Sequence, residues 1–115
     1  MGILLSEERR ISDRWRVDVP CRIAWNGDRI DSLIMDISYT GAKVRSYSTI
    51  PGDGESVRLE VPISRPRRTA TLRARVVHSP PNNGTSDLLG LQFQGFEPEV
   101  KFSVSPIYRC YVGAR

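Results

Sequence analysis

Apolar and polar residues alternate along most of the chain, and short turn sequences separate the alternating runs. In residues 17–25, VDVPCRIAW, every second position from Val17 to Trp25 carries an apolar side chain or a cysteine. A period of two is the pattern of a β-strand that buries one face. The pair NG at 26–27 follows directly and is a hairpin signal, because both residues accept a positive φ. The sequence therefore predicts a β-hairpin that begins near residue 17.

Five further runs show the same alternation. The returning strand of the hairpin is expected from about Ile30 to Ile37, with Leu33, Met35 and Ile37 facing inward. The other predicted strands, with their inward residues, are AKVRS at 42–46 (Ala42, Val44), SVRLEV at 56–61 (Val57, Leu59, Val61), TATLRARVVH at 69–78 (Ala70, Leu72, Ala74, Val76) and LLGLQFQ at 88–94 (Leu89, Leu91, Phe93). Six short strands without a helix among them predict an all-β fold, a small closed antiparallel barrel or sandwich.

The last segment, residues 97–115, does not continue the strand series. Pro106 and a rough alternation of β-branched and aromatic residues argue against a long helix there. We therefore expect a C-terminal tail with at most a turn or two of helix. The predicted organisation is a flexible N-terminal segment at 1–16, a β-domain at 17–96 and this tail.

Length and composition are those of one globular domain. The chain has 115 residues, of which 39% are hydrophobic and 26% charged. It contains no apolar run approaching the roughly 18 residues of a membrane span and no secretory signal, so we expect a cytoplasmic protein without membrane insertion. Of the two cysteines, Cys21 lies in an apolar strand position and is expected to be a buried, inert thiol, and neither has the partners of a zinc site.

The sequence offers little for catalysis. The single histidine, His78, lies at the end of a predicted strand, and no serine or cysteine nucleophile has a recognisable setting around it. The turn PGDGE at 51–55 lacks the lysine and the strand-to-helix context of a phosphate-binding loop. We therefore expect no catalytic residue, no metal site and no cofactor, and a protein that is not an enzyme.

The charged residues point toward an anionic partner. The formal net charge is +4, and of the 17 basic residues 15 are arginine and two, Lys43 and Lys101, are lysine. The planar guanidinium group fits phosphate and the edge of guanine with two parallel hydrogen bonds, which lysine cannot do. A GC-rich coding sequence would produce the same ratio, so composition alone leaves the partner open.

Two short motifs carry the candidate chemistry. The first, RRISDRWR at 9–16, holds four arginines in eight positions. In a helix Arg10 and Arg14 would repel each other at i and i+4, so an extended segment whose guanidinium groups converge on an anion is expected. The alternative is a solvated run of charges.

The second motif is DISYTG at 36–41. Asp36 and Ser38 share one face of an extended strand, and Gly41 permits a tight turn or a close backbone approach by a ligand. A carboxylate accepts from the N1–H and amino groups of guanine, while arginine donates to its O6 and N7. Together the motifs suit a guanine nucleotide. Alone, DISYTG would indicate a plain turn whose Asp or Ser side chain bonds its own backbone.

In this order the two motifs resemble those of the PilZ domain family, which binds the bacterial second messenger cyclic di-GMP. Arg10 and Arg14 match its Arg-x-x-x-Arg motif, and Asp36, Ser38 and Gly41 match its Asp/Asn-x-Ser-x-x-Gly motif. The resemblance implies a six-stranded antiparallel barrel without catalytic activity. It also implies that both arginines hold phosphates and guanine edges, that Asp36 and Ser38 contact a guanine, and that Gly41 shapes the loop.

The resemblance further implies a way of signalling. The N-terminal segment would become ordered around the ligand and relay binding to an unidentified effector protein. Arg9, which precedes the first motif, tends in the family to accompany two intercalated ligand molecules per chain. Two alternatives stay open. One is a basic barrel that stacks single-stranded nucleic acid on Trp15, which we do not favour because Trp15 is the one aromatic residue in an interleaved basic setting and Trp25 lies in an apolar strand position. The other is a PilZ-like module that contacts proteins and binds no nucleotide.

Overall fold

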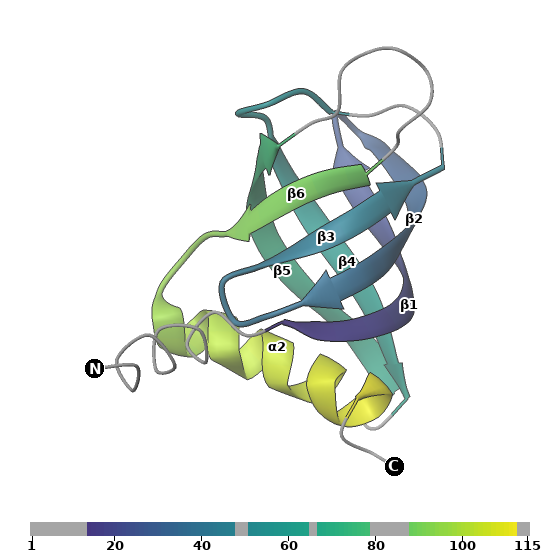
Figure 1. The fold of residues 1–115 in the computed structure, drawn as a ribbon, viewed down its shortest axis with the longest axis vertical. Helices are drawn as coiled ribbons and strands as arrows, with labels where there is room; N and C mark the ends of the chain where they lie inside the picture. Colours follow the sequence, from purple (N-terminus) through teal and green to yellow (C-terminus); the bar gives the residue numbers. More distant parts are fainter. Residues whose placement is uncertain (1–13, 48–50, 65–66, 79–87, 113–115) are drawn as a thin grey trace, which may run out of the picture.

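The computed structural model describes residues 14–47, 51–64, 67–78 and 88–112. Its elements, in chain order, are β1 (Trp15–Trp25), β2 (Asp28–Ile37), β3 (Gly41–Ser46), β4 (Ser56–Ser64), β5 (Arg67–His78), β6 (Leu88–Phe93) and α2 (Glu97–Tyr111). The strands form a closed antiparallel barrel in the order β1-β2-β3-β6-β5-β4, with α2 across one end (Figure 1). The prediction of a six-stranded antiparallel barrel is confirmed.

Strand alternation produces the core as expected for five of the six strands. The predicted inward residues of β3, β4, β5 and β6 are all buried, and so are Val19, Cys21 and Ile23 of β1. At the two ends of β1, Val17 and Trp25 are half-buried and pack against the core. Burial removes the Cys21 thiol from water and raises its pKa to about 12, although a hydrogen bond with the backbone of Ile34 opposes the shift. The thiol therefore stays protonated and unreactive near neutral pH, as predicted. At the hairpin, Asn26 has φ 53° and Gly27 φ 82°, which confirms the turn.

The predicted inner face of β2 is wrong. Leu33 and Met35 are only half-buried, whereas the buried side chains of this strand are Ile30, Ser32, Ile34 and Ile37. The strand carries apolar residues on both faces, so its alternation does not define one inner face. A register shift between Ile34 and Asp36 then returns Ile37 to the core.

The expectation of a largely non-helical tail is also wrong, because Glu97–Tyr111 is a 15-residue helix. Val100, Val104 and Ile107 follow the i, i+4, i+7 spacing of one helical face and are buried. This face packs on β5, β4 and β1 at one end of the barrel. Within the described part of the chain, no helix has the length and apolar character to cross a membrane.

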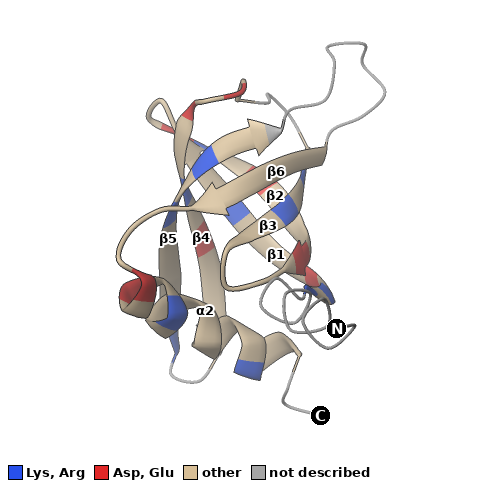
Figure 2. Ribbon diagram, turned by 60° about the vertical axis from the view of Figure 1, so that its left-hand side comes forward, with Lys and Arg blue, Asp and Glu red and all other residues tan. Residues whose placement is uncertain are grey.

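The helix accommodates two prolines, including Pro106, which argued against it. Pro98 lies in the first turn, where backbone N–H groups have no intrahelical acceptor. Pro106 lies inside the helix and removes one backbone hydrogen bond, but it is buried in the contact with the barrel. Figure 2 shows the acidic residues of the first turn in red, where they interact favourably with the helix dipole.

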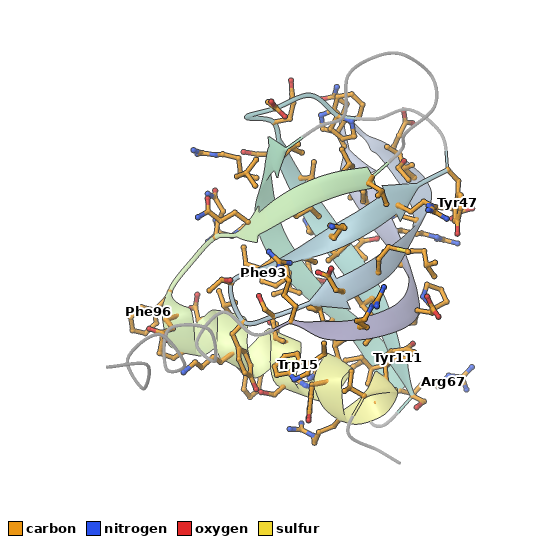
Figure 3. The ribbon with its side chains drawn as sticks, viewed as in Figure 1. Trp15, Tyr47, Arg67, Phe93, Phe96 and Tyr111 are labelled. Atoms are coloured by element: carbon orange, nitrogen blue, oxygen red, sulfur yellow. The ribbon has the colours of Figure 1, made fainter. Side chains whose placement is uncertain are left out.

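The end of α2 is tied to β4 by side-chain contacts. The Tyr111 hydroxyl donates to the carbonyl oxygen of Pro62 over 2.8 Å, and Cys110 Sγ lies 3.3 Å from Ser64 Oγ. Figure 3 shows Tyr111 between the last turn of the helix and the barrel. The helix is thus fixed to the barrel at its C-terminal end as well as along its buried face.

Candidate functional site

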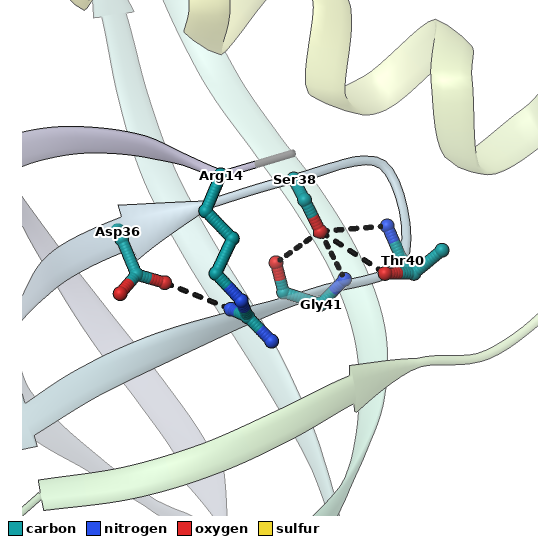
Figure 4. Close-up of polar contacts among 5 residues, drawn as sticks. All are labelled: Arg14, Asp36, Ser38, Thr40 and Gly41. Carbon is teal, nitrogen blue, oxygen red and sulfur yellow. Dashed lines mark hydrogen bonds and ion pairs between the residues drawn. The ribbon is translucent and has the colours of Figure 1, made fainter. Parts of the chain in front are cut away.

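The fold brings the two sequence motifs into direct contact. Arg14 immediately precedes β1, and Asp36 lies at the irregularity in β2, where its backbone pairs with Arg16. Arg14 Nη1 lies 2.8 Å from Asp36 Oδ1, and the two side chains are 49% and 18% exposed (Figure 4). An arginine of the first motif and the carboxylate of the second therefore form one polar site that is open to solvent.

The turn between β2 and β3 is held by Ser38. Its Oγ accepts hydrogen bonds from the backbone N–H groups of Thr40 (3.1 Å) and Gly41 (3.2 Å), and it lies 3.3 Å from the Gly41 carbonyl oxygen and 3.0 Å from Thr40 Oγ1 (Figure 4). The Ser38 side chain is fully buried. The structure thus contains the serine-bonded turn that the motif alone indicates. A contact of this hydroxyl with guanine stays a prediction, and it would require exchange of one of these bonds.

Gly41 is required by the packing of two strands. A Cβ atom at this position would collide with the carbonyl oxygen of Leu91 in β6. The structure thus shows a close approach of the protein's own strand β6 at this glycine, and the approach of a ligand there stays a prediction. Because Gly41 also closes the Ser38 turn, it fixes the position of the site relative to β6.

Aromatic residues connect both motifs to the helix. Trp15, which follows Arg14, packs edge-on against Tyr39 with 5.4 Å between ring centroids, and against Tyr108 of α2 at 4.5 Å. The Tyr39 hydroxyl lies 3.4 Å from Ser105 Oγ of α2. Lys101 Nζ lies 5.8 Å from the centre of the Tyr39 ring. The residue next to Arg14 and the residue next to Ser38 therefore both contact the helix.

Sequence reasoning missed the α2 half of this cluster because it did not predict the helix. Tyr39 could have been proposed as a site residue, since it lies inside the DISYTG motif. Ser105 and Tyr108, which contact Tyr39 and Trp15, lie in the segment that was expected to be an irregular tail. Trp15, considered as a base-stacking residue, is partly buried in the cluster instead. Its ring is therefore not an open stacking surface.

The remaining predicted site residues, Arg9 and Arg10, lie outside the described residues. Among the residues that are described, no three His, Cys, Asp or Glu side chains form a group that could hold a metal ion. The described site thus consists of a solvent-accessible Arg–Asp pair beside a tightly bonded turn, and it offers a planar cation and a carboxylate to a ligand.

Comparison with known families assigns the chain to one of them. The profile of the PilZ domain matches residues 8–102, a range that includes both motifs and the six strands. The chain belongs to the PilZ family. PilZ domains are non-catalytic receptor domains for cyclic di-GMP. A search of curated proteins found no match.

Solved structures of PilZ proteins share the fold. The PilZ domain of CeSA from a cellulose-synthesizing bacterium is 15% identical with a TM-score of 0.61, and the match covers 80% of this chain and 95% of that one. The Bacillus subtilis inhibitor of motility, MotI/DgrA, is 20% identical with a TM-score of 0.60 over 84% of this chain. This chain spans about half of the latter protein, since the match covers 48% of its length.

Proposed function

We propose that this PilZ protein is a receptor for cyclic di-GMP, and that the ligand binds over Arg14, Asp36 and the β2–β3 turn. The observation that carries the proposal is the 2.8 Å contact between Arg14 and Asp36, which joins the two family motifs in one exposed site. Asp36 offers acceptors for the N1–H and amino group of guanine, and Arg14 offers paired donors for a phosphate or for guanine O6 and N7.

The Arg14–Asp36 pair prepares the site without blocking it. An exposed ion pair contributes only about 0–1 kcal/mol, whereas each hydrogen bond to a charged group contributes about 1.5–3 kcal/mol. Opening or sharing the pair therefore costs less than the ligand contacts supply. In the free protein the pair also holds the Arg14 side chain close to the turn, which reduces the ordering required on binding.

Arg9 and Arg10 supply further guanidinium groups in this proposal. Two dinucleotides carry four phosphate charges, which matches the supply of arginines at 9–16 better than one dinucleotide does. We therefore expect two intercalated molecules per chain, with the part of residues 6–16 that precedes Arg14 ordered on binding. Saturation near two ligands, and near one in Arg9→Ala, would agree with this stoichiometry. Saturation of the parent at one ligand would contradict it.

The relay runs through the aromatic cluster. Ligand contacts that shift Arg14 or the Ser38 turn also shift Trp15 or Tyr39, the next residues in the chain. Both rings contact residues of α2, namely Tyr108 and Ser105. Binding would thereby change the position of α2 on the barrel. An effector protein that contacts the helix or its surroundings would then bind more tightly or more weakly.

Calorimetric titration of the full chain with cyclic di-GMP tests the proposal, with GTP and a short single-stranded DNA as competing ligands. Arg14→Ala should weaken cyclic di-GMP binding roughly tenfold to a hundredfold. Arg14→Lys should recover little, because an ammonium group cannot make two parallel contacts. The matched control is Arg22→Ala, since Arg22 is also an exposed arginine paired with an aspartate, Asp31, at 3.4 Å.

Three outcomes would oppose the proposal. Tight, steeply salt-dependent DNA binding without a response to cyclic di-GMP would favour the nucleic-acid alternative. Absence of binding to any nucleotide would favour a protein-contact module. Equal losses in Arg14→Ala and Arg22→Ala would mean that general charge, not the Arg14 site, determines affinity.

A further inference from the structure

A second cluster of arginines lies on the other side of the barrel. In the strand order β1-β2-β3-β6-β5-β4, the β4–β5 pair lies diametrically opposite the β2–β3 pair that carries the candidate nucleotide site. The outer face of β4 and β5 bears Arg58, Arg73 and Arg75, all exposed. Figure 2 shows the charged residues of these strands on the barrel wall.

Two of these arginines face each other directly. Arg58 and Arg73 are register partners in the antiparallel β4–β5 pair. Neighbouring positions of this kind have Cβ atoms about 5 Å apart, and like charges there are destabilising. Arg75 follows on the same face and lies opposite Ser56. The face thus concentrates three positive charges at a cost in stability.

Other arginines of the outer wall have carboxylate partners. Arg22 pairs with Asp31 at 3.4 Å, and Arg29 pairs with Glu60 at 3.0 Å. Within the described ranges, no ion pair joins Arg58, Arg73 or Arg75 to a carboxylate. Glu99 of α2 lines a neighbouring hollow together with Arg73, but the two side chains form no ion pair. The three arginines therefore keep an excess of positive charge that an external anion could neutralise.

The cluster borders a hollow in the surface. Ala24 of β1 lies opposite Arg58, and its short side chain leaves room beside the guanidinium groups. A hollow of about 480 Å³ is lined by Arg58 and Arg73, by Ala24 and Gln94, and by Asp28 and Arg29 of the β1–β2 hairpin. The surface therefore offers both charge and space.

We propose that this face, defined by Arg58, Arg73 and Arg75, docks an extended acidic segment of a partner protein. Arg73 and Arg75 are two residues apart on one strand, about 7 Å, which is also the spacing of alternate side chains in an extended peptide. Carboxylates at that spacing can each receive two parallel hydrogen bonds from a guanidinium group. The proposal does not depend on nucleotide binding.

Exposed apolar residues at both ends of the arginine face favour a protein partner. Val77 of β5 is 51% exposed, and Phe96 at the start of α2 is 69% exposed (Figure 3). Phe96 is two residues beyond Gln94, whose N–H donates to the Arg73 carbonyl oxygen over 2.8 Å. Arginine flanked by an exposed aromatic residue is typical of protein interfaces. A nucleic acid strand would instead require several stacking rings along its path.

The test is a binding titration with a fluorescently labelled peptide of alternating Glu and Val residues, about twelve residues long, against the full chain. A peptide with Gln in place of Glu is the charge control. We expect the Arg58→Ala/Arg73→Ala double variant to bind the acidic peptide about tenfold more weakly. The matched control, Arg22→Ala/Arg109→Ala, loses the same net charge at two exposed arginines outside the hollow and should stay within about twofold of the parent.

Further arms separate this surface from the nucleotide site. Arg14→Ala should retain peptide binding, and Arg58→Ala/Arg73→Ala should retain the cyclic di-GMP affinity of the parent. Circular dichroism and thermal unfolding verify that both double variants fold. Three results would overturn the proposal: equal loss in the two double variants, equal binding of the Glu and Gln peptides, or preference of the arginine face for single-stranded DNA over the acidic peptide.

Discussion

The ring centroids of Trp15 and of Tyr108 in α2 lie 4.5 Å apart. Trp15 directly follows Arg14, the arginine that pairs with Asp36. A ligand contact at Arg14 and a packing contact on the helix are therefore separated by a single peptide unit. This proximity makes Trp15 a natural reporter of events at the site.

We expect cyclic di-GMP to change the fluorescence of Trp15. The chain has two tryptophans, so Trp25→Phe leaves Trp15 as the single emitter. Ligand contacts at Arg14 should alter the packing of Trp15 against Tyr39 and Tyr108, and with it the emission intensity or wavelength. Arg14→Ala in the same background is the control and should remove the response at ligand concentrations that saturate the parent. Unchanged Trp15 emission in a saturated parent protein would contradict a relay through this ring.

Asp36→Ala should change nucleotide preference more than overall affinity for phosphates. Loss of the carboxylate removes the acceptor for guanine N1–H and the guanine amino group, and it also releases Arg14 for phosphate contacts. Affinity for cyclic di-GMP should therefore fall roughly tenfold, while affinity for cyclic di-AMP stays level or rises slightly. Parallel titrations with both nucleotides measure the difference. Equal losses would indicate that Asp36 acts through local structure alone.

Gly41→Ala should destabilise the barrel. The added methyl group would meet the Leu91 carbonyl oxygen, so β3 and β6 must separate locally, which typically costs about 1–3 kcal/mol. Gly52→Ala is the matched control, because a Cβ there meets nothing within 4 Å. Urea unfolding of both variants gives the comparison. A Gly41→Ala protein as stable as Gly52→Ala would show that the strands tolerate the extra atom.

The buried thiol of Cys21 makes stability depend on pH in the alkaline range. Its pKa is raised from 9.0 to about 12, so the folded state holds the proton more tightly than the unfolded state does. Its contribution to stability is complete below about pH 9 and is lost as the pH rises through 12. In the Cys110→Ser variant, Cys21 is the one remaining thiol, and a thiol reagent at pH 8 should react with it only after unfolding. Between pH 9 and 12, the Cys21→Ala variant should lose less stability than the parent protein.

The sequence predicts most of the barrel because five strands present one apolar face each. In β4, for example, Val57, Leu59 and Val61 alternate with polar or charged residues, so only one register buries them. β2 has apolar residues on both faces, and the shift after Ile34 depends on pairing with neighbouring strands, which local sequence does not specify.

The helix could have been predicted from Val100, Val104 and Ile107, whose spacing is helical. Pro106 argued against a helix, but burial of the apolar face on the barrel end compensates for the one backbone hydrogen bond that this proline removes. The site was predictable as a set of residue types, because Arg14, Asp36 and Ser38 lie in motifs. That Ser38 bonds its own turn, and that Tyr39 contacts α2, depends on side-chain positions that only the assembled fold determines.

The position of α2 has a thermodynamic consequence. The helix contacts Trp15 and Tyr39 beside the candidate nucleotide site, and it also packs on β4 and β5, whose outer face carries the arginine cluster. If both ligands change the position of α2 on the barrel, their binding is coupled, and the coupling is reciprocal. The factor by which cyclic di-GMP changes the affinity for the acidic segment then equals the factor by which the segment changes the affinity for cyclic di-GMP. A high concentration of the partner would then change the nucleotide concentration at which the proposed site is half-occupied.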